Sequence, residues 1–201
     1  MKYWIDTEFI ERPYTIDLIS VGLVAEDGRE FYAESSEVDW TKASEWTLQT
    51  VRPQLEGSGM VREEIGYAIR RFVGDDAHPV FWGYFPAYDW VAFCWLFGDM
   101  NELPFRFPQL CMDIEQWAIE LGGPELPRQV GARHHALADA RWTRDAWAYL
   151  ATLHPAGAER CCVGSKYQDQ LAAKLSDDSM TPALRHVSRP PLRLGYGLTR
   201  P

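Results

Sequence analysis

Residues 2–35 read KYWIDTEFIERPYTIDLISVGLVAEDGREFYAES and contain the strongest strand signals of the sequence. It contains three runs rich in aromatic and β-branched residues, at 2–9, 15–25 and 30–35, and each run predicts a strand. The Asp-Gly step at 27–28 is typical of the turn in a hairpin. We therefore expect an antiparallel meander of three strands at the start of the domain.

Helices dominate the chain after this meander. Apolar residues and helix-capping signals indicate five helices, at 39–46, 60–73, 88–97, 113–121 and 136–153. Short apolar runs at 79–84 and near Leu110 predict two further strands. Strands followed by alternating helices predict an α/β fold with a mixed five-stranded sheet, antiparallel over its first three strands and flanked by helices.

We expect the chain to divide into a folded domain at 1–155 and a C-terminal extension at 156–201. Four prolines among residues 181–201 disfavour helix and interior strand, so the extension is expected to be partly extended or mobile. Residues 181–201 also hold four arginines and no acidic residue. These arginines are either a contact for a phosphate backbone or a solvated terminus.

Composition restricts the possible classes of protein. The chain is 46% hydrophobic and 24% charged and has no apolar run of membrane-spanning length, which is typical of a soluble globular protein. No secretory signal is recognisable, so we expect a cytoplasmic protein that does not contact membranes. The net charge of −9 argues against a basic nucleic-acid-binding face. It favours a cluster of carboxylates that binds divalent cations, which would then meet a phosphate.

Two acidic motifs carry the residues for such a cluster. Asp6 and Glu8 are two residues apart on the first strand, so both project from the same face. Close carboxylates repel each other unless a proton or a cation lies between them, although a polar strand end facing water is the alternative. Asp89 lies near the start of the helix expected at 88–97, where capping of that helix is the alternative.

A third motif lies at the start of the last helix. Asp139 falls in the first or second turn of this helix, and His134 lies in the loop just before it. The two side chains can therefore face one cleft. A surface histidine and a surface aspartate are the alternative, but Leu137 and the alanines around Asp139 make full exposure less natural.

Taken in order, these motifs resemble those of the DEDDh family of 3′→5′ exonucleases, the RNase T and oligoribonuclease-like enzymes. The resemblance is strongest to an exoribonuclease subfamily typified by mycobacteria, through Asp-Thr-Glu-Phe-Ile-Glu at 6–11 and His-x-Ala-Leu-x-Asp-Ala-Arg at 134–141. It covers about residues 1–150 and implies an RNase H-like fold. Phe85 stands where many members of the wider family carry Asn, a difference that bears on substrate handling.

The resemblance implies a phosphodiester hydrolase that removes nucleoside 5′-monophosphates from RNA, or from single-stranded DNA, at the 3′ end. Two ions, Mg²⁺ or Mn²⁺, suit the oxygen ligands that four carboxylates supply, which are Asp6, Glu8, Asp89 and Asp139. His134 would be the general base, because the pKa of an imidazole is ordinarily near neutral. His135 is the alternative base. The resemblance also implies a homodimer.

Substrate contacts are expected around the first two motifs. Thr7, Phe9 and Ile10 follow the acidic strand and could hold the terminal nucleotide, with Phe9 stacking on a base. A place in the core is the alternative for Phe9 and Ile10, and Tyr88 beside Asp89 is similarly open. Arg141 is expected to form a structural ion pair rather than a phosphate contact.

The sequence is also compatible with three other functions. The first is a DNA 3′→5′ exonuclease, since the group that would recognise the 2′-hydroxyl has no sequence signature. The second is a catalytically silent nucleic-acid-binding module on the same fold. The third is a protein-interaction domain whose acidic residues form a solvated face.

Overall fold

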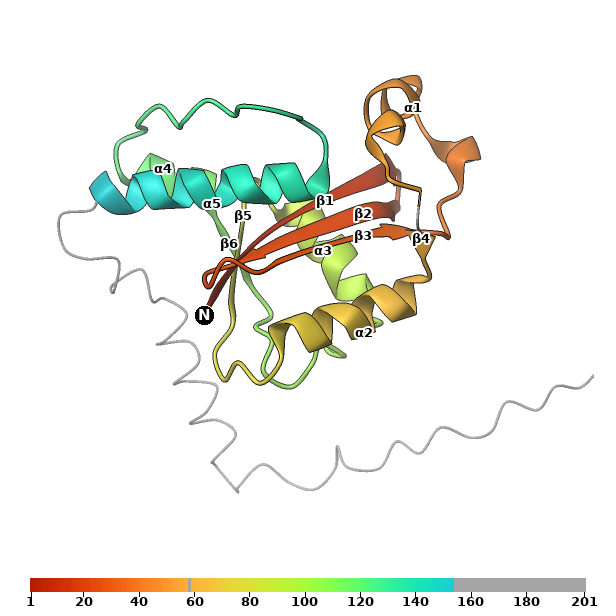
Figure 1. Cartoon of the computed structure of the whole chain (residues 1–201), viewed down its shortest axis with the longest axis horizontal. Coiled ribbons are helices and arrows are strands. Elements are labelled where there is room, and N and C mark those ends of the chain that lie inside the picture. The colour runs from red at the N-terminus through yellow and green to blue at the C-terminus, as the bar shows by residue number, and fades with distance from the viewer. Residues whose placement is uncertain (58, 154–201) are drawn as a thin grey trace, which may run out of the picture. The chain divides into compact units, whose positions relative to one another are not determined.

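Six strands form one mixed sheet in the computed structural model, which describes residues 1–57 and 59–153 of the chain. The strands are β1 (Lys2–Arg12), β2 (Thr15–Ala25), β3 (Glu30–Ser35), β4 (Gly59–Met60), β5 (Val80–Gly83) and β6 (Cys111–Asp113). Their order is β4-β3-β2-β1-β5-β6 (Figure 1). β2 is antiparallel to both β1 and β3, and the other neighbours pair in parallel. The extension expected at 156–201 lies outside the described residues.

The prediction of five strands is wrong by one strand. β4 consists only of Gly59 and Met60, which pair in parallel with Glu34 and Ser35 at the end of β3. Two residues are too few to give an alternating pattern, so the sequence indicated only a break at this point. The antiparallel meander is confirmed, and β2 and β3 have the bounds expected from the sequence.

Five α-helices accompany the sheet in the described part of the chain. They are α1 (Glu45–Thr50), α2 (Arg62–Val73), α3 (Ala87–Trp95), α4 (Ile114–Glu120) and α5 (Ala136–Leu153). The helix expected within 39–46 is instead a 3₁₀ turn at Trp40–Lys42, followed by α1, whose first turn is capped by Ser44. No helix among the described residues is long and apolar enough to cross a membrane.

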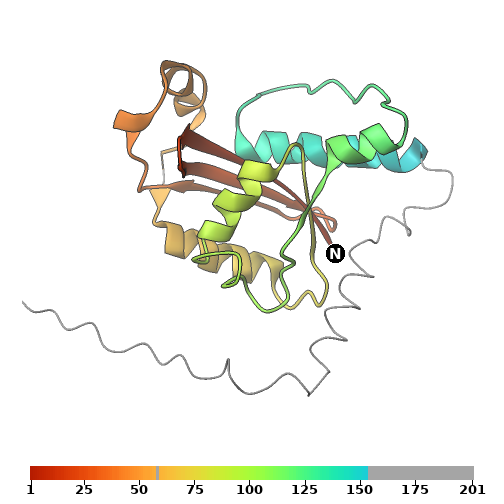
Figure 2. The ribbon, with the colours of Figure 1, turned by 180° about the vertical axis from the view of Figure 1, so that it is seen from behind.

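Helices cover both faces of the sheet (Figures 1 and 2). Tyr3 of β1 belongs to the core on the face covered by α2 and α3. Trp4, the next residue, belongs to the core on the face covered by α4 and α5. β1 is therefore a central strand that is buried on both sides, as its mixture of aromatic and aliphatic residues indicates.

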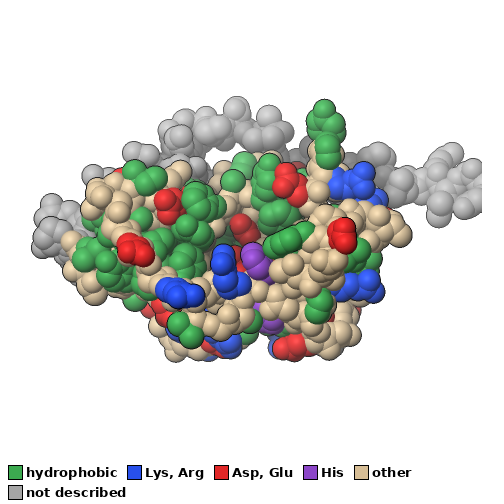
Figure 3. Space-filling view, turned by 90° about the horizontal axis from the view of Figure 1, so that it is seen from above, with side chains coloured by type: hydrophobic (Ala, Val, Ile, Leu, Met, Phe, Trp, Pro, Cys, Tyr) green, Lys and Arg blue, Asp and Glu red, His purple; other side chains and the backbone are tan. Residues whose placement is uncertain are grey.

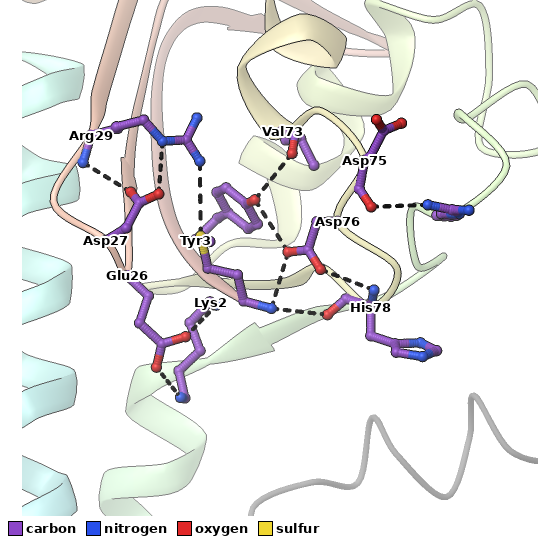
Figure 4. A network of polar contacts seen from close by, with 11 residues as sticks. Lys2, Tyr3, Glu26, Asp27, Arg29, Val73, Asp75, Asp76 and His78 are labelled. Carbon is purple, nitrogen blue, oxygen red and sulfur yellow. Dashed lines mark hydrogen bonds and ion pairs between the residues drawn. The ribbon is translucent and has the colours of Figure 1, made fainter.

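Polar contacts fix the start of β1 (Figure 4). The hydroxyl of Tyr3 donates to the carbonyl of Val73 at 3.4 Å and to Oδ2 of Asp76 at 3.2 Å. The N-terminal ammonium lies 3.0 Å from the same carboxylate oxygen. Burial, and then the negative charge of Asp76, raise the pKa of Tyr3 to about 12, so its hydroxyl remains a donor at physiological pH. These contacts hold the strand on which Asp6 and Glu8 lie.

Gly22 of β2 allows α5 to begin close to the sheet. It is the partner of Asp6 in the β1–β2 register. A Cβ atom at this position would lie 2.4 Å from the backbone carbonyl carbon of Ala136, the first residue of α5. Only a residue without a side chain permits this approach. The start of α5 is thereby brought next to the carboxylate of Asp6.

Candidate active site

The site begins with two carboxylates on the α5 face of the sheet. Trp4, Asp6 and Glu8 alternate with residues of the opposite face, and Trp4 already lies in the core beneath α5. Glu8 is only 9% exposed, whereas Asp6 keeps part of its surface in a cavity. The alternative of a strand end facing water is therefore wrong for Glu8.

Asp89 approaches the same carboxylates from α3. Its Oδ1 accepts hydrogen bonds from the backbone N–H of Thr7 at 2.8 Å and from the Thr7 hydroxyl at 2.7 Å. The N-cap of α3 is Pro86, and no side chain caps this helix. The alternative of Asp89 as a helix cap is therefore wrong, because its carboxylate turns to the acidic strand instead.

Asp139 and His134 complete the site from the start of α5. Oδ2 of Asp139 accepts a hydrogen bond from the backbone N–H of His134 at 2.9 Å, and Oδ1 accepts one from the side-chain amide of Gln129. His134 has a positive φ of 63°, which few residues other than glycine adopt. Possible ligand atoms of Glu8, His134 and Asp139 all lie within 4.8 Å of one another. His134 and Asp139 therefore lie close together and line the same cavity.

Burial and mutual repulsion make the acidic cluster unfavourable without a cation. The pKa of Asp6 is raised well above its usual range by burial and then by the charges of Asp89, Asp139 and Glu8. Burial, followed by Asp139 and Asp89, raises the pKa of Glu8 to about 8. Burial also raises the pKa of Asp89 to about 6, although its hydrogen bonds from Thr7 oppose this shift.

The donor set fits a divalent metal. No lysine or arginine among residues 1–57 and 59–153 forms an ion pair with any of these four carboxylates. Buried carboxylates are normally neutralised by a paired cation or by a metal. The four carboxylates supply oxygen ligands, which Mg²⁺ and Mn²⁺ prefer.

A cavity of about 840 Å³ is lined by two of these carboxylates, Asp6 and Asp139. Its other lining residues are Tyr84, Trp142, Thr143 and several residues of the loop before α5, His134 among them. Figure 3 looks down on this hollow, where histidine, acidic and basic side chains gather. The volume lies in the upper part of the range of roughly 300–1,000 Å³ that is usual for binding pockets.

The four residues expected to contact a substrate have different surroundings. Thr7 is buried and binds Asp89, so it positions a carboxylate. Ile10 is 2% exposed in a core cluster, which favours the core alternative for its side chain. Phe9 and Tyr88 form an edge-to-face pair with centroids 6.0 Å apart, and Tyr88 is exposed. They are the aromatic surface beside Asp89.

Several residues of the site carried no signal in the sequence. The side-chain amide of Gln54 donates to the carbonyls of Arg133 at 2.6 Å and His134 at 3.0 Å, and so fixes the loop before α5. Trp46 packs edge-on against His134, with ring centroids 4.9 Å apart. Gln54 ends a second 3₁₀ turn at Arg52–Gln54, and Trp46 lies in α1, so both are far from His134 along the chain.

Two further predictions concern Arg141 of α5 and His135, the residue just before this helix. Arg141 forms an ion pair with Glu30 at 2.5 Å, which confirms the expected structural role. His135, the alternative base, stacks on Tyr32 with ring centroids 4.6 Å apart, and its Nδ1 accepts from the backbone N–H of Ala138 at 3.4 Å. His134, in contrast, has a ring nitrogen within 4.8 Å of carboxylate oxygens of Glu8 and Asp139.

Comparison with known proteins agrees with the motifs. Residues 1–151 match the 3′-5′ exoribonuclease Rv2179c-like domain. Two relatives from strains of Mycobacterium tuberculosis, named 3′-5′ exoribonuclease MT2234.1 and 3′-5′ exoribonuclease Rv2179c, are each 40% identical over 148 residues, which cover 70% of this chain and 88% of the relative. A solved structure titled "Structure of yeast NOT1 MIF4G domain co-crystallized with CAF1" aligns at 16% identity over 78% of this chain and 82% of that one, with a TM-score of 0.41 that is too low to inform the fold. This chain belongs to the Rv2179c-like 3′-5′ exoribonuclease domain family.

Proposed function

We propose that the protein is a metal-dependent 3′→5′ exoribonuclease of the DEDDh type, built on an RNase H-like fold. One observation carries the proposal: carboxylates from β1, α3 and α5, three distant parts of the chain, come together beside His134. The names of the relatives at 40% identity support RNA as the substrate. The burial of Glu8 and Asp89 argues against a solvated acidic face for binding proteins.

Asp6, Glu8, Asp89 and Asp139 would hold two Mg²⁺ or Mn²⁺ ions. Such ions, when bound, polarise the phosphate, activate water and stabilise the leaving oxygen. Asp6 would be a central member of this set, because the charges of Asp89, Asp139 and Glu8 all contribute to raising its pKa. Thr7 holds Asp89 and Gln129 holds Asp139, so both carboxylates are oriented before a ligand arrives.

His134 would act as the general base. Its ring lies within reach of the carboxylates of Glu8 and Asp139, where a water attacking the phosphate would be bound. The imidazole would take the proton of this water, and the 3′ oxygen of the penultimate nucleotide would leave. The product is then a nucleoside 5′-monophosphate and an oligonucleotide shorter by one residue. The edge of Trp46 against the ring restrains its orientation.

The test is digestion of a 5′-labelled single-stranded RNA in Mg²⁺, Mn²⁺ or chelator, with products resolved nucleotide by nucleotide. We expect a ladder that shortens from the 3′ end, needs a divalent ion and releases 5′-monophosphates. A matched DNA oligomer separates RNA from DNA preference, and faster digestion of DNA would replace the substrate in this proposal. Metal binding without any cleavage of the RNA or the DNA oligomer would instead support a catalytically silent binding module.

A further inference from the structure

The connection between α4 and α5 is long and forms one wall of the cavity. Residues 121–135 contain neither helix nor strand. Connections of about 12–15 residues without regular structure are uncommon in small domains and usually serve a function. Arg128 and Arg133 of this loop line the same cavity as the carboxylates Asp6 and Asp139.

The backbone of this loop is fixed beside both arginines. The indole N–H of Trp142 donates to the carbonyl of Pro127 at 2.8 Å, next to Arg128. Gln54 donates to the carbonyl of Arg133 itself at 2.6 Å. The two arginine side chains therefore start from anchored positions, which reduces the entropy lost when they bind a ligand.

The guanidinium groups themselves have no partner in the described part of the chain. Both side chains are exposed, and neither forms an ion pair, although acidic residues line the same cavity. Both carboxylate oxygens of Asp139 already accept other hydrogen bonds, from Gln129 and from the backbone of His134. Two anchored but unpaired arginines in one pocket favour an anionic ligand, and the planar guanidinium suits phosphate best.

We propose that Arg128 and Arg133 form a subsite for the phosphate one step upstream of the bond that is cut. The inference rests on the proposed function, which places the cut phosphate at the four carboxylates. The arginines come from the loop before α5, and neither forms an ion pair with these carboxylates, so they would meet the next phosphate along the strand. Tyr84 and Trp142, an edge-to-face pair with ring centroids 4.9 Å apart, also line the cavity and offer an apolar surface to sugar or base.

This subsite predicts which 3′ ends are preferred. A dinucleotide without a 5′ phosphate contains only the phosphate that is cut, and so cannot use the arginines. The same dinucleotide with a 5′ phosphate, or any longer strand, presents an upstream phosphate. The expected substrates are therefore strands that carry at least one further phosphate upstream of the bond that is cut.

The test compares kcat/KM for a ribodinucleotide with and without a 5′ phosphate, using the full chain in Mn²⁺. Wild-type protein should prefer the phosphorylated form. Arg128→Gln and Arg133→Gln should each lower this preference by about tenfold, the loss expected for one charge-assisted contact. Arg70→Gln is the matched control, because Arg70 is an exposed arginine on α2, on the opposite face of the sheet.

Equal rates of the wild type on both dinucleotides would overturn the subsite. Equal losses on both substrates in the arginine variants would also overturn it. Such losses would mean that these side chains contact the cut phosphate or have only a structural role. A change of the preference in Arg70→Gln would also overturn it, by showing that overall charge governs the ratio. A wild type that cleaves neither the dinucleotides nor a long RNA would contradict the proposed function itself.

Discussion

At the scale of single residues, His134 has a strained backbone conformation and its ring lies beside the acidic cluster. Its positive φ of 63° lets its backbone N–H reach Asp139 while its ring stays near Glu8. Residues other than glycine keep such a conformation only when the surroundings enforce it, and functional sites are where this is most often seen. Here Gln54 and Trp46 supply the restraint.

His134→Ala should lower kcat on RNA by about 10²–10⁴-fold, the usual contribution of a general base, with a smaller change in KM. Steady-state digestion of a labelled RNA measures both constants. His135→Ala is the control, because this ring stacks on Tyr32 and supports the start of α5. It should lower Tm slightly and leave kcat near that of the wild type. The reverse pattern would make His135 the base.

Asp6→Asn should separate activity from stability. The variant should lose more than about 100-fold in activity, because it removes a ligand carboxylate. In chelator its Tm should rise by a few degrees, since a buried charge that repels three others is gone. Glu11→Gln, an exposed position on the same strand, should change neither quantity. A lower Tm for Asp6→Asn in chelator would show that the repulsion is not important.

At the scale of elements, local patterns explain what the sequence could predict. β2, β3 and α5 have the expected bounds because their apolar residues recur along one continuous segment. β4 exists only through its pairing with β3, so it has no local pattern. The contact between Gln54 and Arg133 spans 79 positions in the chain and carries no motif. The acidic motifs were recognised because they occur as an ordered set, whereas their partners Gln129 and Trp46 depend on tertiary packing.

Gly22→Ala should damage the site by moving α5 away from β1. The new Cβ would overlap the backbone of Ala136, and such overpacking lowers the free energy of unfolding by about 1–3 kcal/mol. Gly66→Ala is a matched control, because its Cβ would lie 2.4 Å from the carbonyl oxygen of Leu96, on the α2 and α3 face. Both variants should show a lower Tm. Below both transitions only Gly22→Ala should lose activity, and equal losses would argue against this placement of α5.

At the scale of the whole molecule, the acidic cluster is held against its own repulsion. Folding brings four carboxylates into a partly buried space without a basic partner among the described residues. The rest of the domain must stabilise this arrangement, chiefly through the two cores on either side of β1. Functional sites commonly lower stability in this way, and a bound ligand restores it.

The stability of the metal-free protein should therefore fall as pH rises. Glu8 has a folded pKa of about 8 against an ordinary 4.5, and Asp89 of about 6 against 3.8. Between these values the folded protein binds more protons than the unfolded chain, so the free energy of unfolding decreases with increasing pH. In chelator, Tm should drop from pH 5 to pH 8. Mn²⁺ should raise Tm more at pH 8 than at pH 5, because protons and metal compete for the same oxygens.

Thermal melts over this pH range, with chelator or with Mn²⁺, measure both effects. Glu8→Gln is the informative variant, because it removes a carboxyl group whose pKa burial raises to about 8, and it should flatten the fall of Tm in chelator. Glu11→Gln should melt like the wild type at every pH, since this side chain is exposed at the end of β1. An Mn²⁺ effect that is equal at pH 5 and pH 8, or that persists in full in Glu8→Gln, would mean that the metal binds elsewhere. The carboxylates would then have to be stabilised by something other than a divalent cation.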